Sequence, residues 1–199
     1  MRKSYLIPLG FALLCTFILF ACKDKTASGG SNSSKDPVAK EFLVTDSSVG
    51  DLQIGMELDE VEAKLGEKIT LMNKNPQDVW IDSAMVQYKG EPVTLMFDRR
   101  WVVEDSFYLV LGGVKINTNK FKTKEGIGVG SEKEEVWKAF NDGFVFNMYP
   151  EFEDTTYTTL SKTRSNITVG HGEGNILIFQ LLNSKVKIME LNQYYNDEE

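Results

Sequence analysis

Cysteine and histidine are nearly absent from this sequence, which limits the chemistry that the folded chain can perform. The two cysteines are Cys15 and Cys22, and the one histidine is His171. Both cysteines lie at the N-terminal end, so the rest of the chain has none for a disulfide, a thiolate metal site or a nucleophile. A zinc site requires more histidine or cysteine ligands than one histidine supplies. We therefore expect no cofactor and no metal.

An excess of positive charge is also absent. The chain has 22 basic and 29 acidic residues, which gives a formal net charge of −7. A negative protein repels the phosphate backbone of DNA or RNA. This balance excludes nucleic acid as a partner.

A hydrophobic run long enough to span a membrane is missing as well. The apolar run Tyr5–Phe20 falls short of the roughly 20 residues that a spanning helix needs, and it follows the basic start Met1–Ser4. The run ends in Leu19-Phe20-Ala21-Cys22, which resembles a bacterial lipobox. We therefore expect residues 1–21 to be a lipoprotein signal peptide and Cys22 to be the lipid attachment site.

The lipoprotein resemblance implies an anchor and a location. The sulfur of Cys22 would carry a diacylglyceryl group and the new N-terminus an acyl chain such as palmitate, and more than one chain makes anchoring stable. Lys23 follows the cysteine, and the resemblance to Gram-negative lipoproteins then implies the outer membrane. Whether the domain faces the periplasm or the cell surface is left open. Residues 22–40, rich in Gly, Ser and Lys, are predicted to be a flexible tether.

The remaining chain contains an internal repeat with a spacing of 75 residues. Residues 54–66 align with residues 129–141 without gaps, with identical pairs at Gly55/Gly130, Glu57/Glu132, Glu60/Glu135 and Val61/Val136. Each copy has a glycine turn, acidic residues at the start of a helix and one apolar stripe. Ser131 and Glu134 have the spacing of a capping box. The repeat predicts two units, residues 41–119 and 120–199.

Strand-like runs follow each predicted helix. Examples are Val93–Phe97, Val102–Val110 and Ile176–Leu182, and Asp98-Arg99-Arg100 is interpreted as a turn between the first two. Phe97 and Phe179 are taken as an equivalent pair. The predicted fold class is α+β: two tandem repeats, each with short helices packed on one face of an antiparallel β-sheet.

The segments Ser48–Met56 and Lys122–Ser131 resemble those of Bacteroides-type tandem-repeat lipoproteins. More remotely they are similar to the BamE/OmlA-type outer-membrane-assembly lipoproteins and to β-lactamase inhibitor protein. The resemblance covers about residues 41–199 and implies helices packed on a four-stranded antiparallel sheet in each repeat. It transfers no functional residues, because its motifs are a glycine turn and a helix start.

Catalytic groups are not brought together by any spacing in the sequence. The run Gly126–Ser131 lacks the spacing of a nucleotide-binding loop and is interpreted as a helix-entry turn. His171 lies between glycines. The acidic groups Glu104-Asp105 and Glu151/Glu153/Asp154 would point to opposite faces of a strand or lie in a polar loop, so their carboxylates do not converge. We therefore predict that the protein is not an enzyme.

Aromatic residues in the second half are candidates for contacts with a partner. Tyr149, Phe152, Tyr194 and Tyr195 lie outside the predicted helix stripe, although core packing of the same residues is an alternative. We predict a non-catalytic membrane-anchored envelope lipoprotein that binds another envelope protein in an assembly or adaptor role. The alternatives are an inhibitor of a periplasmic or secreted enzyme and a carboxylate-based hydrolase. The partner's identity and the oligomeric state are left open.

Overall fold

The computed structural model describes residues 37–73, 81–103, 106–142, 145–170 and 174–193. These residues belong to one compact unit, Lys35–Glu199. The predicted signal peptide, the tether up to residue 36 and Cys22 lie outside the described residues, as do His171, Tyr194 and Tyr195.

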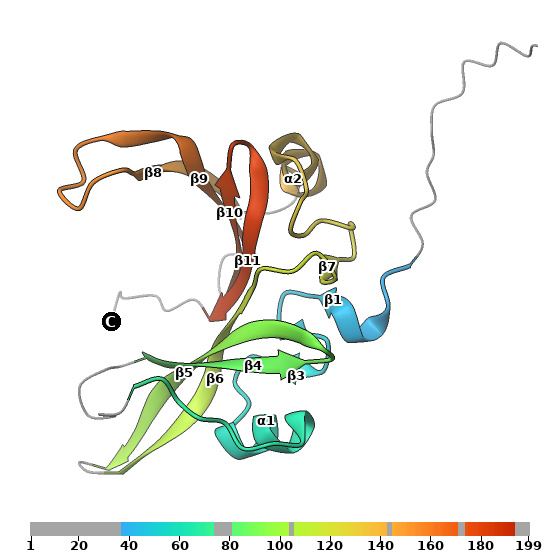
Figure 1. The fold of residues 1–199 in the computed structure, drawn as a ribbon, viewed down its shortest axis with the longest axis vertical. Helices are drawn as coiled ribbons and strands as arrows, with labels where there is room; N and C mark the ends of the chain where they lie inside the picture. The colour runs from blue at the N-terminus through green and yellow to red at the C-terminus, as the bar shows by residue number, and fades with distance from the viewer. Residues whose placement is uncertain (1–36, 74–80, 104–105, 143–144, 171–173, 194–199) are drawn as a thin grey trace, which may run out of the picture. The chain divides into compact units, whose positions relative to one another are not determined.

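An antiparallel sheet of seven strands dominates the described chain (Figure 1). In spatial order its strands are β4 (Ile81–Tyr88), β5 (Glu91–Val103), β6 (Ser106–Ile116), β11 (Lys185–Gln193), β10 (Asn175–Leu182), β9 (Leu160–Gly170) and β8 (Val145–Phe152). Apolar residues alternate along these strands, so that one face of the sheet forms the core. Leu95, Val114 and Met189 are examples of fully buried core residues.

A small sheet and short helices complete the described elements. The four-stranded sheet has the order β3 (Leu52–Gln53), β2 (Ser48–Val49), β1 (Leu43–Val44) and β7 (Lys122–Thr123), and β1 pairs with β7 in parallel. The helices are the 3₁₀ turn η1 (Lys40–Phe42), α1 (Leu58–Leu65) and α2 (Lys133–Phe140). Within the described residues, no helix has the length and apolar character to cross a membrane.

The predicted α+β class, with helices packed on the sheet of each repeat, is wrong. Strand accounts for 55% and helix for 13% of the described residues, which contain 11 strands in two sheets and only two α-helices. Each α-helix has eight residues, and the buried ones are only Val61 in α1 and Val136 and Phe140 in α2. The sequence pattern indicates the short apolar stripes of the two helices, but most of the core comes from the strands. The protein is mostly β.

The repeated segments form the helix starts, with one correction. Glu57 and Glu132 are the N-cap residues, and each forms a reciprocal capping box with Glu60 and Glu135, respectively. The capping box predicted from Ser131 and Glu134 is therefore displaced by one residue. A glutamate at the N-cap was overlooked because shorter side chains are preferred there.

The two helix starts are attached to the large sheet by the same hydrogen bonds. Gly55 N–H donates to Leu111 O at 2.7 Å, and Leu111 N–H donates to Met56 O at 2.7 Å. In the second half, Gly130 N–H donates to Val186 O and Val186 N–H donates to Ser131 O, both at 2.9 Å. Both glycines have φ of 92°, a conformation that a side chain strongly disfavours.

The sheet itself also repeats. The pairing of β5 with β6 shifts between Met96 and Phe97, and the pairing of β10 with β11 shifts between Gln180 and Leu181. Relative to these bulges, Leu95 is the counterpart of Phe179, so the equivalence of Phe97 with Phe179 is wrong by two residues. The predicted boundaries 41–119 and 120–199 stay a prediction.

The two halves meet where β6 pairs with β11. Lys115 lies directly opposite Glu190 in this pairing, and Lys115 Nζ is 3.2 Å from the Glu190 carboxylate. Asn192 Nδ2 also donates to Glu190 Oε1 at 2.6 Å. Lys115 and Glu190 are 75 residues apart, so the pseudo-twofold relation between the halves places equivalent positions opposite each other. If both halves had the same charged residue at this position, two like charges would face each other, whereas lysine and glutamate attract.

Substitution of Lys115 by Glu should destabilise the whole domain. Two carboxylates would then face each other where β6 pairs with β11, which we call the seam. Because Glu190 is buried, we expect a loss of roughly 1–3 kcal/mol in the free energy of unfolding. The measurement is urea unfolding at pH 7. Lys187→Glu makes the same charge change at an exposed position of β11 and should leave the midpoint nearly unchanged. Equal effects of the two variants would show that net charge, not the pair, matters.

Candidate functional site

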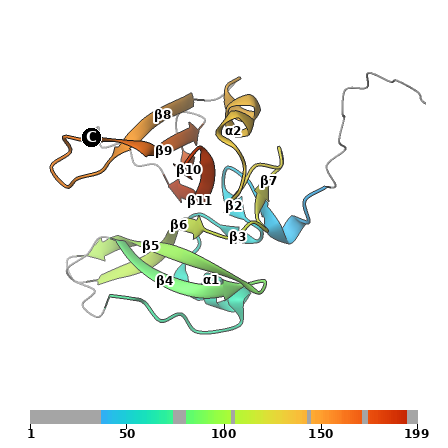
Figure 2. The ribbon, with the colours of Figure 1, turned by 45° about the horizontal axis from the view of Figure 1, so that its top comes forward.

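Eight of the fifteen large apolar side chains that are exposed among the described residues lie on two hairpin extensions. We call Arg100–Val103 with Ser106–Tyr108 the first arm, at the end of β5–β6, and Tyr149–Leu160 the second arm, at the end of β8–β9. Both hairpins extend from the same side of the large sheet (Figures 1 and 2). Exposed apolar residues on them are Trp101, Val102, Val103, Tyr108, Tyr149, Phe152, Tyr157 and Leu160.

The first arm is an addition to the repeated plan. Tyr108 and Leu109 occupy the positions that correspond, 75 residues on, to Asn183 and Ser184. Asn183 and Ser184 have φ of 51° and 63° and form the tight turn that ends β10–β11. The β5–β6 hairpin continues beyond this point, so its outer residues have no counterpart in the second half and are not required by the shared core.

Aromatic packing gives the first arm a defined shape. Trp101 and Phe107 lie opposite each other in the β5–β6 pairing, and their rings pack edge to face with centroids 5.3 Å apart. The Trp101 side chain nevertheless remains 48% exposed. An edge-to-face pair of this kind is worth about 1 kcal/mol and holds the indole in place without covering it.

A buried arginine lies at the base of the first arm. The Arg99 guanidinium carbon is 4.7 Å from the centroid of the Phe107 ring. Arg99 is 6% exposed, and its Nε and Nη2 atoms have no hydrogen-bond partner in the structure. A buried donor without an acceptor is unfavourable by about 1–3 kcal/mol.

The tip of the second arm is organised around Asp154. Its carboxylate accepts hydrogen bonds from the main-chain N–H groups of Thr156, Thr158 and Thr159 and from two threonine hydroxyls. These donors, first the Thr158 N–H, hold the pKa of Asp154 well below its usual range. Tyr157, with φ of 56°, packs its ring 5.4 Å from that of Phe152 and is 74% exposed.

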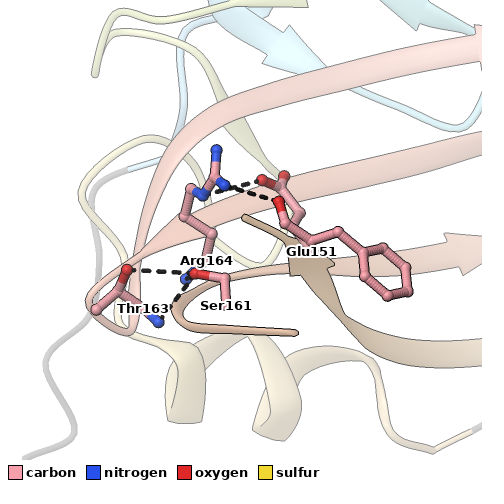
Figure 3. A network of polar contacts seen from close by, with 5 residues as sticks. Glu151, Ser161, Thr163 and Arg164 are labelled. Carbon is pink, nitrogen blue, oxygen red and sulfur yellow. Dashed lines mark hydrogen bonds and ion pairs between the residues drawn. The ribbon is translucent and has the colours of Figure 1, made fainter. Parts of the chain in front are cut away.

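A polar network braces the second arm where its strands bend (Figure 3). The β8–β9 pairing shifts between Pro150 and Phe152. Arg164 Nη2 donates to Phe152 O at 2.7 Å, and Arg164 Nε lies 3.6 Å from the Glu151 carboxylate. Within β9, the strand that carries Arg164, Ser161 Oγ accepts from the N–H groups of Thr163 and Arg164 at 3.3 and 3.0 Å. The bend therefore has fixed partners on both strands.

The structure describes two of the four aromatics that the sequence offers as candidates for partner contacts. Tyr149 and Phe152 lie on the second arm and are 46% and 38% exposed. They are surface residues, and core packing, the alternative interpretation, is wrong for them. Whether they contact a partner stays a prediction. Tyr194 and Tyr195 lie outside the described residues.

Sequence reasoning missed the first arm. The predicted turn at Asp98-Arg99-Arg100 is wrong, because β5 runs through these residues without interruption from Glu91 to Val103. Trp101, Val102 and Val103 contain the signal that could have found it. Successive strand residues point to opposite faces, so three consecutive apolar residues in a strand with one buried face cannot all be core.

A hollow of about 300 Å³ lies elsewhere, between the small sheet and the second half. Its wall includes Leu43, Phe140 and Leu177, and Asp46 and Glu125 lie at its rim. Among the described residues, no group of three or more His, Cys, Asp or Glu is placed to hold a metal ion. The hollow is mainly apolar, and the absence of enzyme activity stays a prediction.

Comparisons with known proteins add no family to this description. No protein-family model, no curated protein and no solved structure matches the chain. The resemblance to tandem-repeat lipoproteins therefore stays a prediction, and the arms must be interpreted from their own geometry.

Removal of the Arg164 side chain should loosen the second arm without unfolding the domain. We expect Arg164→Met to change the global free energy of unfolding by less than about 1 kcal/mol, because the side chain is partly exposed. Amide hydrogen exchange at Glu151–Thr159 should become faster, since the bend loses its partners. Lys162→Met, on the same strand, serves as the control and should leave that exchange unchanged. Equal protection in both variants would mean that Arg164 does not brace the arm.

Proposed function

We propose that this chain is a non-catalytic lipoprotein of the bacterial envelope that binds another protein through its two arms. The observation that carries the proposal is the concentration of exposed aromatic and aliphatic side chains on hairpin extensions that the core does not require. Contiguous exposed apolar surface on a soluble domain is typical of a binding site.

The residues on the arms are of the types that dominate binding energy. Tryptophan and tyrosine are enriched among the few residues that carry most of the affinity of an interface. Trp101 and Tyr108 on the first arm and Tyr149 and Tyr157 on the second are partly exposed and can bury more surface on contact. At about 25 cal/mol per Å² of apolar surface, covering a large ring contributes more than 1 kcal/mol.

Contacts within the chain position the exposed rings of both arms. The Trp101–Phe107 packing and the Asp154 hydrogen bonds hold the exposed rings, and Arg164 braces the bend of the second arm. A surface that is already ordered loses less conformational entropy on binding. This order favours recognition of a folded protein surface over adaptation to many shapes.

The proposed anchor complements the arms. A lipid on Cys22 and a tether over residues 22–40 would confine the domain to a layer beside the membrane. The resemblance to Gram-negative lipoproteins implies that this is the outer membrane. Confinement raises the effective concentration of the arms near other envelope proteins, so that a modest affinity is sufficient.

Truncation of the arm aromatics should remove the partner. We expect Trp101→Ala with Tyr108→Ala, and separately Phe152→Ala with Tyr157→Ala, each to weaken binding at least about tenfold. The measurement is affinity capture from detergent-solubilised envelope, followed by titration of the protein recovered with the wild type. Met72→Ala with Met85→Ala removes exposed apolar side chains away from the arms and is the matched control.

The outcomes separate the functions under comparison. Loss of one specific protein in both arm variants, with retention in the control, supports binding through the arms. A partner retained by both arm variants but lost with Tyr194→Ala and Tyr195→Ala would place the surface at the C-terminus and contradict the proposal. Turnover in a broad hydrolase screen that disappears on substitution of an acidic pair would contradict a non-catalytic role.

Cys22→Ser should release the protein from the membrane. Without the cysteine sulfur no diacylglyceryl group can be attached, and the tether has no apolar run long enough to hold the domain at the membrane. Fractionation after a high-salt wash should recover the variant in the soluble fraction and the wild type in the membrane fraction. The neighbouring Lys23→Ser is the control and should remain membrane-bound. Equal membrane recovery of Cys22→Ser and the wild type would place the anchor elsewhere.

A further inference from the structure

Strand β8 is an outer strand of the large sheet, and its main-chain groups identify what could pair with it. β8 pairs with β9 on one side, and no described strand lies on the other. Pro150 has no N–H group, so in an outer strand it occupies a position whose main chain points away from the neighbour. Main-chain direction alternates along a strand. The N–H and C=O groups of Phe146 and Met148 therefore also point outward, away from β9.

This part of the edge lacks the usual protection against pairing. Outer strands are commonly protected by lysine, proline or a bulge. In β8 the proline and the bulge lie at Pro150 and beyond, whereas Val145–Tyr149 contains no charged residue. At the opposite edge of the sheet, Met72 N–H already donates to Ser83 O of β4 at 2.8 Å. The part of the β8 edge that has neither a strand beside it among the described residues nor this protection is therefore Val145–Tyr149.

We propose that this stretch pairs, antiparallel, with the same stretch of a second copy of the chain. In the register in which Phe146 of one copy lies opposite Met148 of the other, each copy uses both outward-pointing residues. Each such pair exchanges two main-chain hydrogen bonds. A register shifted so that Met148 faces itself would place Phe146 opposite Pro150, which has no N–H to donate. The two large sheets become one continuous sheet across a twofold axis.

In this register the side chains of one copy are complementary to those of the other copy. On the outer face, Val145 of one copy lies opposite Tyr149 of the other, an aromatic and β-branched pair of the kind that stabilises sheets. On the inner face, Phe146 lies opposite Met148, which places a thioether beside an aromatic ring. Asn147 faces Asn147, and one amide can donate to the other. No like charges meet within the stretch.

Exposed apolar surface surrounds the same edge. Val145, Met148 and Tyr149 are exposed, and so is Trp137 of α2, whose ring packs against Phe146 with centroids 4.9 Å apart. A second copy would cover these side chains as well as the main-chain groups. The pairing covers Tyr149, which belongs to the second arm, but it uses the edge of β8 and leaves Trp101, Tyr108 and Tyr157 uncovered for the proposed partner.

A single cysteine tests both the pairing and its register. Asn147 lies at the twofold position, where Cα atoms of opposite residues are about 4.5 Å apart, within the range of a disulfide. Two copies of residue 145 would be separated by roughly 13 Å along the strands, which is too far for a disulfide. We therefore expect Asn147→Cys in the full chain to give a disulfide-linked dimer on mild oxidation, several-fold above the wild-type background from its own cysteines. Val145→Cys should stay at that background.

A mass measurement without cross-linking completes the test. The full chain in detergent micelles should sediment as a dimer, and Asn147→Lys should sediment as a monomer because two lysines would face each other at the axis. Thr155→Lys, in the loop of the second arm, is the charge-matched control and should remain dimeric. A monomeric wild type, or equal cross-linking of Asn147→Cys and Val145→Cys, would overturn the proposal. If the wild type is dimeric but captures no envelope protein, only the proposed function of the arms is contradicted.

Discussion

The antiparallel pairing of β6 with β11 is the interaction on which the rest of this structure depends. These strands come from the two halves of the described chain, and their pairing joins two three-stranded sets, with β8 added at one edge, into a single seven-stranded sheet. Lys115 and Glu190 lie at its centre, opposite each other and in corresponding positions. Because a symmetric arrangement of identical residues would repel there, the difference between the two halves is itself stabilising. The seam also aligns the hairpins at either end of the sheet.

The shared plan of the halves consists of backbone geometry more than of side chains. A glycine with φ of 92°, two hydrogen bonds to the last strand and a bulge in the preceding pair recur in both. Side chains at corresponding positions differ in size, as Leu95 and Phe179 show. The arms fall outside this plan. Trp101 and Tyr157 lie on extensions that each half makes in a different hairpin, which is why we propose that the arms bind a partner.

The two surfaces proposed for recognition differ in chemistry. The arms offer aromatic rings held by local contacts, such as those of Trp101 with Phe107 and of Tyr157 with Phe152. The β8 edge offers main-chain donors and acceptors, whose spacing admits only an extended strand in a limited register. A dimer through β8 would present the arms of both copies on one assembly. Two weak contacts on a membrane-confined dimer can then act together.

Local chemistry in the sequence determined the glycine turns, the acidic helix starts and the apolar alternation of strands such as Val93–Phe97. These features depend on neighbours within a few residues, so pattern alone locates them. The mostly β class, the β6–β11 seam and the arms were decided by tertiary structure. Asp98 and Arg99 illustrate the reason: their charges indicate a turn, yet β5 continues through them, because pairing with Val110 and Leu109 of β6 provides a place for both side chains. Gly112 has no side chain where the Asp98 carboxylate lies, since a Cβ there would be 2.0 Å from Asp98 Oδ2. Such compensation comes from residues on another strand, and only the folded chain brings them together.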